Sequence, residues 1–426
     1  MIHRPLSPKN IRVAVQRYAG SDARKVSSTT IKRPYPTMRP VNRFAFQITL
    51  STLCCAAAHA QSSVTLYGLL DGGVAYVSHA AAADGTSGSA FRFGNAMSGN
   101  RWGLKGSEEL GGGLSAVFQL ESGYSLGTGV AAQGGREFGR TAIVGLSSTR
   151  WGTIRMGRQY DPLVDLVSAL TEDAYFGLTF GPPGDVDNYD GSMRVNNAIK
   201  YTSPLVGGVR LAALYGFGGV AGATSAGQTW SVAGSYAYGP FSVAAGYFSA
   251  NGGNAMNGAG VRTWSASADS PFNTAANAGF ASTHAVNIVR IAAQYAAGAW
   301  TVGAGYSRTE YVPDGASAFH VRTRFNDGSA FANYRIGAAL NAGIGYHYTW
   351  LAGASSAHYH QLNAGIDYLL SKRTDVYAIA AFQRASGTTL GAAGTPVVAQ
   401  AVIGDYGLNA GANTQTIVAI GMRQRF

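Results

Sequence analysis

Apolar and polar side chains alternate along the last segment of the chain, 416–426. Its polar face carries two arginines, Arg423 and Arg425. Its apolar face carries Val418, Ile420, Met422 and Phe426. A cationic row facing inward is costly in a soluble protein, whereas a membrane barrel turns apolar side chains toward lipid and polar ones toward a wet lumen. The pattern predicts a strand of an outer-membrane β-barrel, with an amphipathic edge strand of a soluble sandwich as the alternative.

The same two-residue period recurs in sixteen segments that are rich in Tyr, Val, Ala and Gly. They span 63–77, 90–106, 114–123, 137–147, 152–160, 193–203, 208–216, 228–238, 241–249, 284–296, 299–308, 321–336, 338–350, 357–370, 374–384 and 414–426. Tight turns such as 111–113 and 371–373 join some of them, and long polar loops join others. The long loops are 124–136, 161–192, 250–283 and 385–413. Short periplasmic turns opposite long external loops are typical of outer-membrane barrels, so we predict an all-β, 16-stranded antiparallel transmembrane β-barrel.

The alternation also assigns side chains to lipid or lumen. In segment 193–203 the lumen face is expected to carry Arg194, Asn196 and Lys200. The lipid face is expected to carry Val195, Ile199 and Tyr201. Charged side chains thus fall on the wet side of the wall. A soluble sandwich would need larger aliphatic side chains on its inner face than this chain, rich in Gly and Ala, provides.

The N-terminal region contains the features of a secretion signal. Residues 38–43 are basic, 44–57 are mostly apolar, and Ala58-His59-Ala60 forms a cleavage site before Gln61. The apolar run is too short to cross a bilayer as a helix. We therefore expect 38–60 to be a signal peptide that is removed on export.

The remaining N-terminal residues, 1–37, are basic and aperiodic. We expect a misassigned start or a disordered extension there, with a mitochondrial-type targeting arm as the alternative. The first 60 residues hold ten of the 32 basic and one of the 21 acidic residues, so the net charge falls from +11 for the whole chain to +2 for the barrel, 61–426. A nucleic-acid partner is therefore not expected. Cys54 and Cys55 both precede the cleavage site, which excludes disulfides and thiol chemistry in the exported chain.

We expect neither a cofactor, nor a metal site, nor enzymatic activity. Segment 185–191 has the oxygen density of a Ca²⁺ loop but lacks the regular spacing and closing Glu of an EF-hand, so calcium binding is the weaker alternative. His358 and His360 share a face without a third ligand nearby. Neither a Walker pattern nor a nucleophile elbow occurs in 61–426.

Five motifs stand out along the chain: SVTLYGLLD at 63–71, NRWGLKGSEELG at 100–111, GRQYDP at 157–162, YLLSKRT at 368–374, and the terminal Arg425-Phe426. Together they resemble motifs of the general porins of β-proteobacteria. The resemblance covers essentially all of 61–426. It implies a homotrimer of sixteen-stranded barrels, embedded in outer-membrane lipid and lipopolysaccharide, with the third external loop folded into each pore. The terminal Phe426 also resembles the signal by which the barrel-assembly machinery recognises its clients.

Loop 161–192 fits the constriction loop that this resemblance implies, because it is too long for a surface turn. Its start, 162–170, is predicted to be a short amphipathic helix whose apolar face is buried on the inner wall. Its acids are expected to face the water path. They are Glu172, Asp173, Asp185, Asp187 and Asp190.

The wall opposite the loop is expected to be basic, because narrow pores select by rings of charge. Arg101 and Arg194 have lumen-side parity and match wall arginines of the porin constriction. Arg158 matches a third by motif, but its parity is lipid-side, so a β-bulge would be needed to turn it inward. Arg140 is a fourth candidate with the same difficulty. The alternative is that these arginines only pair with acids in the lumen.

These features predict an outer-membrane channel for the passive diffusion of small hydrophilic solutes and ions. We expect weak anion selectivity, because arginines on strands are held more firmly than carboxylates on a loop. A porin specific for one solute, an outer-membrane enzyme and an adhesin are the alternatives. An outer-membrane enzyme needs fewer strands and a catalytic cluster at the rim, so the strand count disfavours it.

Overall fold

A computed structural model describes residues 63–391, 394–404 and 408–426 of the chain. The predicted N-terminal extension, 1–37, and the predicted signal peptide, 38–60, lie outside the described residues, and both stay predictions. None of the helices in the described part of the chain is long and apolar enough to cross a membrane.

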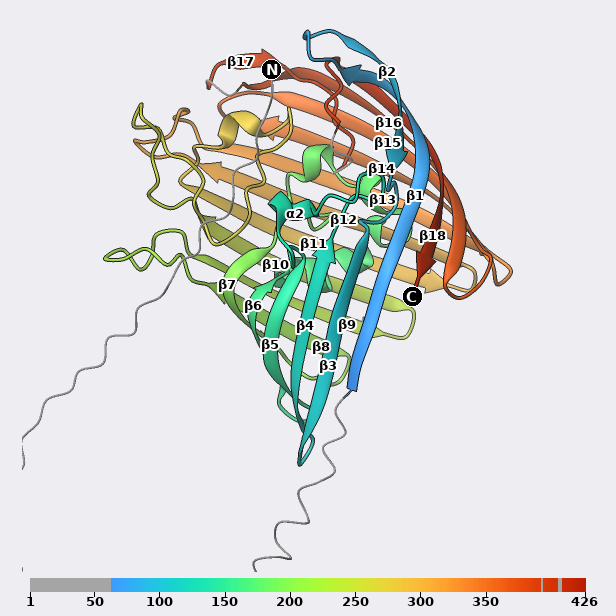
Figure 1. The fold of residues 1–426 in the computed structure, drawn as a ribbon. Coiled ribbons are helices and arrows are strands. Elements are labelled where there is room, and N and C mark those ends of the chain that lie inside the picture. Colours follow the sequence, from blue (N-terminus) through green and yellow to red (C-terminus); the bar gives the residue numbers. More distant parts are fainter. Residues whose placement is uncertain (1–62, 392–393, 405–407) are drawn as a thin grey trace, which may run out of the picture. The chain divides into compact units, whose positions relative to one another are not determined.

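The described residues form eighteen strands and a few short helices (Figure 1). The strands are β1 (Ser63–Ala81), β2 (Ser87–Gly94), β3 (Arg101–Gly111), β4 (Leu114–Gly123), β5 (Thr141–Ser148), β6 (Gly152–Gln159), β7 (Val195–Thr202), β8 (Val209–Gly216), β9 (Thr229–Tyr238), β10 (Phe241–Asn251), β11 (Ala285–Ala297), β12 (Trp300–Val312), β13 (Thr323–Ile336), β14 (Leu340–Ala352), β15 (Ala357–Leu369), β16 (Thr374–Leu390), β17 (Pro396–Val398) and β18 (Thr414–Arg425). The helices are α2 (Ala132–Gly135), α3 (Pro162–Leu166) and α4 (Asp173–Phe176), with single turns η2 (Ser168–Leu170), η3 (Gly177–Thr179), η4 (Pro183–Asp185) and η5 (Ala278–Phe280).

These strands make a closed antiparallel barrel with sixteen strand positions. Strands that follow each other along the wall are hydrogen-bonded neighbours, and β1 pairs with β18 to close the ring. The strands β2 and β3 pair with successive halves of β1 and share one position in the wall. The short β17 pairs only with the end of β16. The predicted fold class is confirmed, and each of the sixteen predicted segments overlaps a strand.

The predicted strand 90–106 is interrupted where the chain binds the buried carboxylate of Asp71, a residue of β1, in place of the β1 backbone. Its Oδ2 accepts hydrogen bonds from the backbone N–H groups of Met97, at 3.0 Å, and Ser98, at 2.6 Å. The backbone N–H of Asp71 in turn donates to Asn100 Oδ1. These bonds replace ladder pairs, so β2 ends before this segment and β3 begins after it.

The face assignment is confirmed for most of β7 and wrong at its start. Ile199 and Tyr201 are exposed on the outer face, and Lys200 is buried inside. Val195, expected to face lipid, is instead 1% exposed and packs in the interior cluster around Leu163. The cause is an extra residue in β7: the register against β6 shifts here, and Asn197 has a φ of 50°.

The long segment between β6 and β7 folds into the barrel, where strands surround its short helices (Figure 1). Pro162 starts α3, and the Asp161 side chain caps it by accepting a hydrogen bond from the N–H of Leu163 at 2.8 Å. Leu163 and Leu166 then pack on the inner wall with residues such as Phe248. The predicted amphipathic helix at 162–170 corresponds to α3 and η2.

Glycines in the wall make room for the far end of this loop. The rings of Phe176 and Phe180 stack at 5.2 Å and lie in a second interior cluster. A Cβ atom at Gly343 or Gly365 would collide with the Phe176 ring. These two glycines, on neighbouring strands, therefore leave the space in which the Phe176 ring packs against the wall and keeps the loop in the lumen.

Candidate functional site

A cavity of about 400 Å³ lies between the inner wall and the folded-in loop. Three arginines line it from the wall: Arg101 at the start of β3, Arg140 just before β5 and Arg194 just before β7. Two acids line it from the loop, Asp173 in α4 and Asp190. The structure thus brings three of the four predicted arginines together, opposite loop carboxylates.

Only one of the three arginines is neutralised by an ion pair within the described residues. Arg140 donates from Nε to Glu121 Oε1 at 2.7 Å, and the other oxygen of that carboxylate accepts a hydrogen bond from the Tyr67 hydroxyl at 2.8 Å. Neither Arg101 nor Arg194 has a carboxylate within ion-pair distance in this part of the chain. Their positive charges are therefore available to ions in the cavity.

Tyr160 lies within this group of positive charges. The guanidinium carbons of Arg194 and Arg140 lie over its ring, 4.7 and 5.9 Å from the centre, and Arg194 Nη2 donates to its hydroxyl at 2.6 Å. Burial alone would raise the pKa of the Tyr160 hydroxyl, but the nearby charges of Arg140 and Arg194 outweigh it and lower that pKa. The shift reflects a positive potential on this side of the cavity.

On the acidic side of the cavity, burial and a hydrogen bond both act on Asp173. The Asp173 carboxylate accepts a hydrogen bond from Thr171 Oγ1 at 2.6 Å. Burial raises the pKa of Asp173 to about 6, although the Thr171 hydrogen bond and the charge of Arg290 oppose the shift. A carboxyl with this pKa is still mostly ionised at neutral pH and loses its negative charge only as the pH falls toward 6 and below.

The other predicted acids are buried and do not contribute to the lining of the cavity. Glu172, Asp185 and Asp187 are each about 1% exposed and do not line it. Asp185 accepts hydrogen bonds from the backbone N–H groups of Asp190 and Ser192, at 2.8 and 3.1 Å. Asp187 accepts one from the N–H of Tyr189 at 3.0 Å. These two carboxylates hold the fold of the loop.

Glu172 is pressed against the barrel wall at Gly345. Neither of its carboxyl oxygens makes a hydrogen bond of good geometry to a described residue, although Asn363 lies close by. Burial raises the pKa of Glu172 to about 8, and the charge of His347 and the nearby Asn363 offset only part of this rise. The side chain is therefore mostly protonated at neutral pH.

Arg158 lies outside the cavity. Its two terminal nitrogens bind both carboxylate oxygens of Asp269, at 2.9 and 2.6 Å, and its Nε donates to the carbonyl of Gly139. The register between β6 and β7 does shift near Arg158, but the extra residue lies opposite it in β7, so Arg158 keeps its lipid-side parity and is not turned inward. Arg140 reaches the cavity because it precedes β5, where strand parity does not apply.

Sequence reasoning did not identify Tyr160 and Glu121 as part of this site. Tyr160 lies within the motif 157–162, directly after β6. Its place in this motif, next to Arg158, was the signal that could have identified it. Glu121 faces the lumen near the end of β4. The alternation of lumen-facing and lipid-facing residues along this strand could have predicted that orientation.

The C-terminal Phe426 lies at the seam where the barrel closes. Its N–H donates to the Gly68 carbonyl at 3.1 Å, and the Gly68 N–H donates back to the Phe426 carbonyl at 3.0 Å. A Cβ atom at Gly68 would collide with the Phe426 ring. The last residue therefore takes part in the β1–β18 junction, and its role as an assembly signal stays a prediction.

Comparison with known proteins identifies close similarity to one group. A family model described as Gram-negative porin matches residues 48–388. An outer membrane porin protein of Bordetella pertussis is 30% identical over 363 residues, covering 77% of this chain and 90% of that protein. Outer membrane porin protein 32 of Delftia acidovorans is 38% identical over 180 residues, 40% of this chain and 48% of that protein.

Solved structures show the same architecture. The anion-selective porin from Comamonas acidovorans superposes with a TM-score of 0.64 at 25% identity, covering 86% of this chain and all of that one. A trimer form of OmpT, an outer membrane protein of Vibrio cholerae, superposes with a TM-score of 0.59 at 16% identity, covering 86% of this chain and 99% of that one. At 16% identity, the similarity to OmpT shows a shared fold and nothing more.

Proposed function

The chain belongs to the Gram-negative porin family and forms an outer-membrane channel for passive diffusion, and we propose that its constriction weakly favours anions. Family and fold point to a channel rather than an enzyme, and we assign it no catalytic role. The proposed constriction is the cavity between Arg101, Arg140 and Arg194 on the wall and Asp173 and Asp190 on the loop.

One observation carries this proposal: Arg101 and Arg194 face the cavity without an ion-pair partner in the described part of the chain. Burial raises the pKa of the opposing Asp173 to about 6, so its negative charge weakens as the pH falls below neutral. The two arginines without ion-pair partners add a positive potential on the wall side of the path. The similarity to the anion-selective porin from Comamonas acidovorans supports the same direction.

The test is the reversal potential of single-residue variants in planar bilayers at low salt. Arg101→Ser and Arg194→Ser should each shift it toward cations and enlarge the conductance, because each removes an unpaired charge and a long side chain. Arg150→Ser is the matched control: Arg150 is exposed in the turn between β5 and β6 and stacks on Trp151. If neither lumen variant differs from this control, the constriction has been assigned to the wrong arginines.

We also propose that the protein is exported with cleavage before Gln61 and assembles as a homotrimer in lipid and lipopolysaccharide with the help of the barrel-assembly machinery. The cleavage rests on the Ala58-His59-Ala60 site behind an apolar run. The intact mass of the outer-membrane form should correspond to a chain whose first residue is Gln61. A mature protein that retains residues 1–37 would contradict this. Calcium binding at 185–191 is not part of this proposal, because both carboxylate oxygens of Asp185 and one of Asp187 accept hydrogen bonds from backbone N–H groups.

A further inference from the structure

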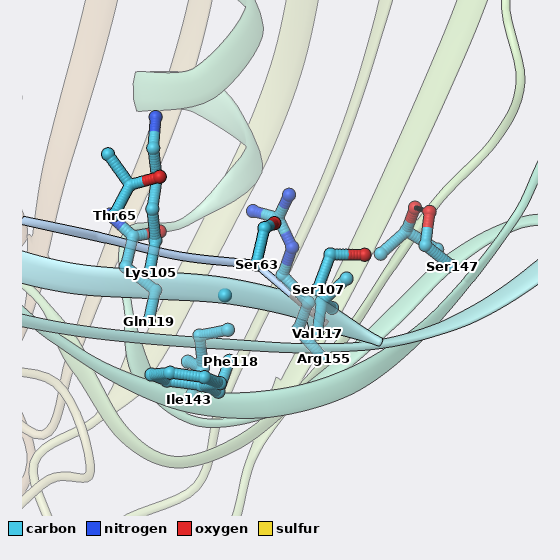
Figure 2. A pocket seen from close by; sticks show the side chains of 12 residues that line it. Ser63, Thr65, Lys105, Ser107, Val117, Phe118, Gln119, Ile143, Ser147 and Arg155 are labelled. Carbon is cyan, nitrogen blue, oxygen red and sulfur yellow. Dashed lines mark hydrogen bonds between the residues drawn. The ribbon is translucent and has the colours of Figure 1, made fainter. Parts of the chain in front are cut away.

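A second group of positive side chains lines the barrel wall between the constriction and the short turns. Figure 2 shows Lys105 and Arg155 rising from the same concave stretch of wall. Together with neighbouring side chains they enclose a cavity of about 270 Å³. Five hydroxyl side chains contribute to its lining: Ser63, Thr65, Ser107, Ser147 and Thr153.

The strand register places these groups on one lumen-facing surface. Lys105 pairs with Thr65 of β1 on one side and Gln119 of β4 on the other. Arg155 of β6 pairs with Gly145 of β5. Lys105 follows Arg101 by four residues along β3, which is about 13 Å at the usual rise of a strand. The cavity is therefore separate from the constriction.

Neither cation is neutralised by the described protein. Lys105 and Arg155 form no ion pair within the described ranges, and the Lys105 ammonium lies 5.2 Å from the centre of the Tyr67 ring. Lys200, the ladder neighbour of Arg155 in β7, differs from these two cations because it has an ion-pair partner. Its ammonium binds Asp165 at 2.5 Å, so its charge is compensated. The wall thus keeps two uncompensated charges close to several hydroxyl groups.

The neighbouring residues favour an oxygen-rich anion over a bare halide. Ser147 Oγ and Thr153 Oγ1 lie 2.9 Å apart, so one hydroxyl donates to the other and the second proton is left for a ligand. A Cβ atom at Gly145 would lie 3.2 Å from Arg155 Cγ. The missing side chain therefore leaves room for the stem of Arg155 to lie along the wall. A guanidinium, an ammonium and hydroxyl donors together match the oxygens of phosphate or carboxylate.

We propose that Lys105 and Arg155 form a binding site for small oxyanions on the short-turn side of the constriction. An anion in this site is held by charge and hydrogen bonds in a wet wall, so binding is weak and fast. Such a site raises the local concentration of oxyanions beside the pore and slows their passage relative to chloride. It uses none of the three constriction arginines, so its test is independent of the proposed selectivity.

The test is a planar-bilayer measurement of chloride current with inorganic phosphate added on both sides. Phosphate should reduce the current of the natural protein in a saturable way. The double variant Lys105→Gln with Arg155→Gln should raise the half-inhibiting phosphate concentration about fivefold, because two solvent-exposed ion contacts are lost. Arg150→Gln, which removes a charge from the same end of the barrel outside the cavity, should leave it unchanged. Heat-modified mobility on gels confirms that each variant is folded.

Three results would overturn the site. The first is an absence of saturable phosphate inhibition in the natural protein. The second is a folded double variant with unchanged inhibition. The third is an inhibition that Arg101→Ser removes and the double variant does not, which would place the bound anion in the constriction. If the double variant behaves as expected while Arg101→Ser leaves selectivity unchanged, the oxyanion site stands and the constriction proposal fails.

Discussion

At the scale of single residues, the balance of charge in the cavity depends on Glu121. This carboxylate binds Arg140 and thereby removes one of three positive charges from the path. In Glu121→Gln the amide oxygen can still accept the hydrogen bond from Arg140 Nε, but the negative charge that neutralises Arg140 is gone. We expect the anion-to-cation permeability ratio to rise about twofold, in keeping with the strength of a partly solvated ion pair.

The measurement is the reversal potential at low salt, with Glu109→Gln as the control. Glu109 is an exposed acid near the short turn after β3 and bonds to Ser115. Its loss should change the ratio less than the loss of Glu121. An unchanged ratio in Glu121→Gln would mean that Arg140 does not influence permeating ions.

The sequence identified some residues of this site and misplaced others for a physical reason. Parity along a strand correctly turns Arg101 toward the lumen, because alternation is a local property of the backbone. The side of a loop that a residue faces depends on packing far away in sequence. Glu172 is buried because the wall offers glycines beneath it, such as Gly345. No local pattern distinguishes it from the neighbouring Asp173, which lines the cavity.

At the scale of elements, the protonated carboxyl of Glu172 contributes to the docking of the folded-in loop. An ordinary Glu loses its proton near pH 4.5, whereas burial raises the pKa of Glu172 in the folded protein to about 8. The loop's docking is therefore most stable below pH 4.5 and loses this contribution as the pH rises to about 8. Above that range a buried carboxylate would face His347 and Asn363 with too few hydrogen bonds.

Glu172→Gln should remove this pH dependence, because the amide stays neutral and has nearly the same shape. We expect its melting temperature to fall less between mildly acidic and alkaline pH than that of the natural protein. Glu137→Gln is the control, since Glu137 is an exposed acid of another loop. If the melting temperature changes with pH to the same extent in the natural protein and in both variants, Glu172 is not the group that titrates.

The strands themselves could be predicted well, because two-residue alternation and turn residues are encoded locally. The departures arise from tertiary contacts. Asp71 gathers backbone donors and divides β2 from β3, and the extra residue near Asn197 reverses the parity of Val195. The capped start of α3 was visible in the sequence because Asp161 and Pro162 are standard signals for a helix N-terminus.

At the scale of the whole molecule, closure of the barrel satisfies the backbone of the edge strands. The pairing of β1 with β18 and the contacts of Phe426 with Gly68 complete the ring. The proposed homotrimer rests on the resemblance of the sequence motifs to those of general porins. We therefore expect the unheated protein to migrate as a trimer on gels and to become a monomer only after heating. A folded monomer in mild detergent would contradict the assembly.

The net charge of the predicted mature chain gives only a slight positive bias, so selectivity must come from the placement of charges. Residues 61–426 carry a net charge of +2, whereas Arg101 and Arg194 concentrate positive charge at the proposed constriction. Salt screens such charges over about 30 Å at 0.01 M and about 3 Å at 1 M. Selectivity set by the constriction should therefore depend strongly on salt.

The most direct measurement is the reversal potential of the natural protein in potassium chloride gradients at decreasing total salt. We predict a sign that favours chloride at low salt, and a magnitude that declines toward zero as the salt approaches about 1 M. A potential that favours potassium at low salt, or one that stays at zero throughout, would contradict a positively biased constriction.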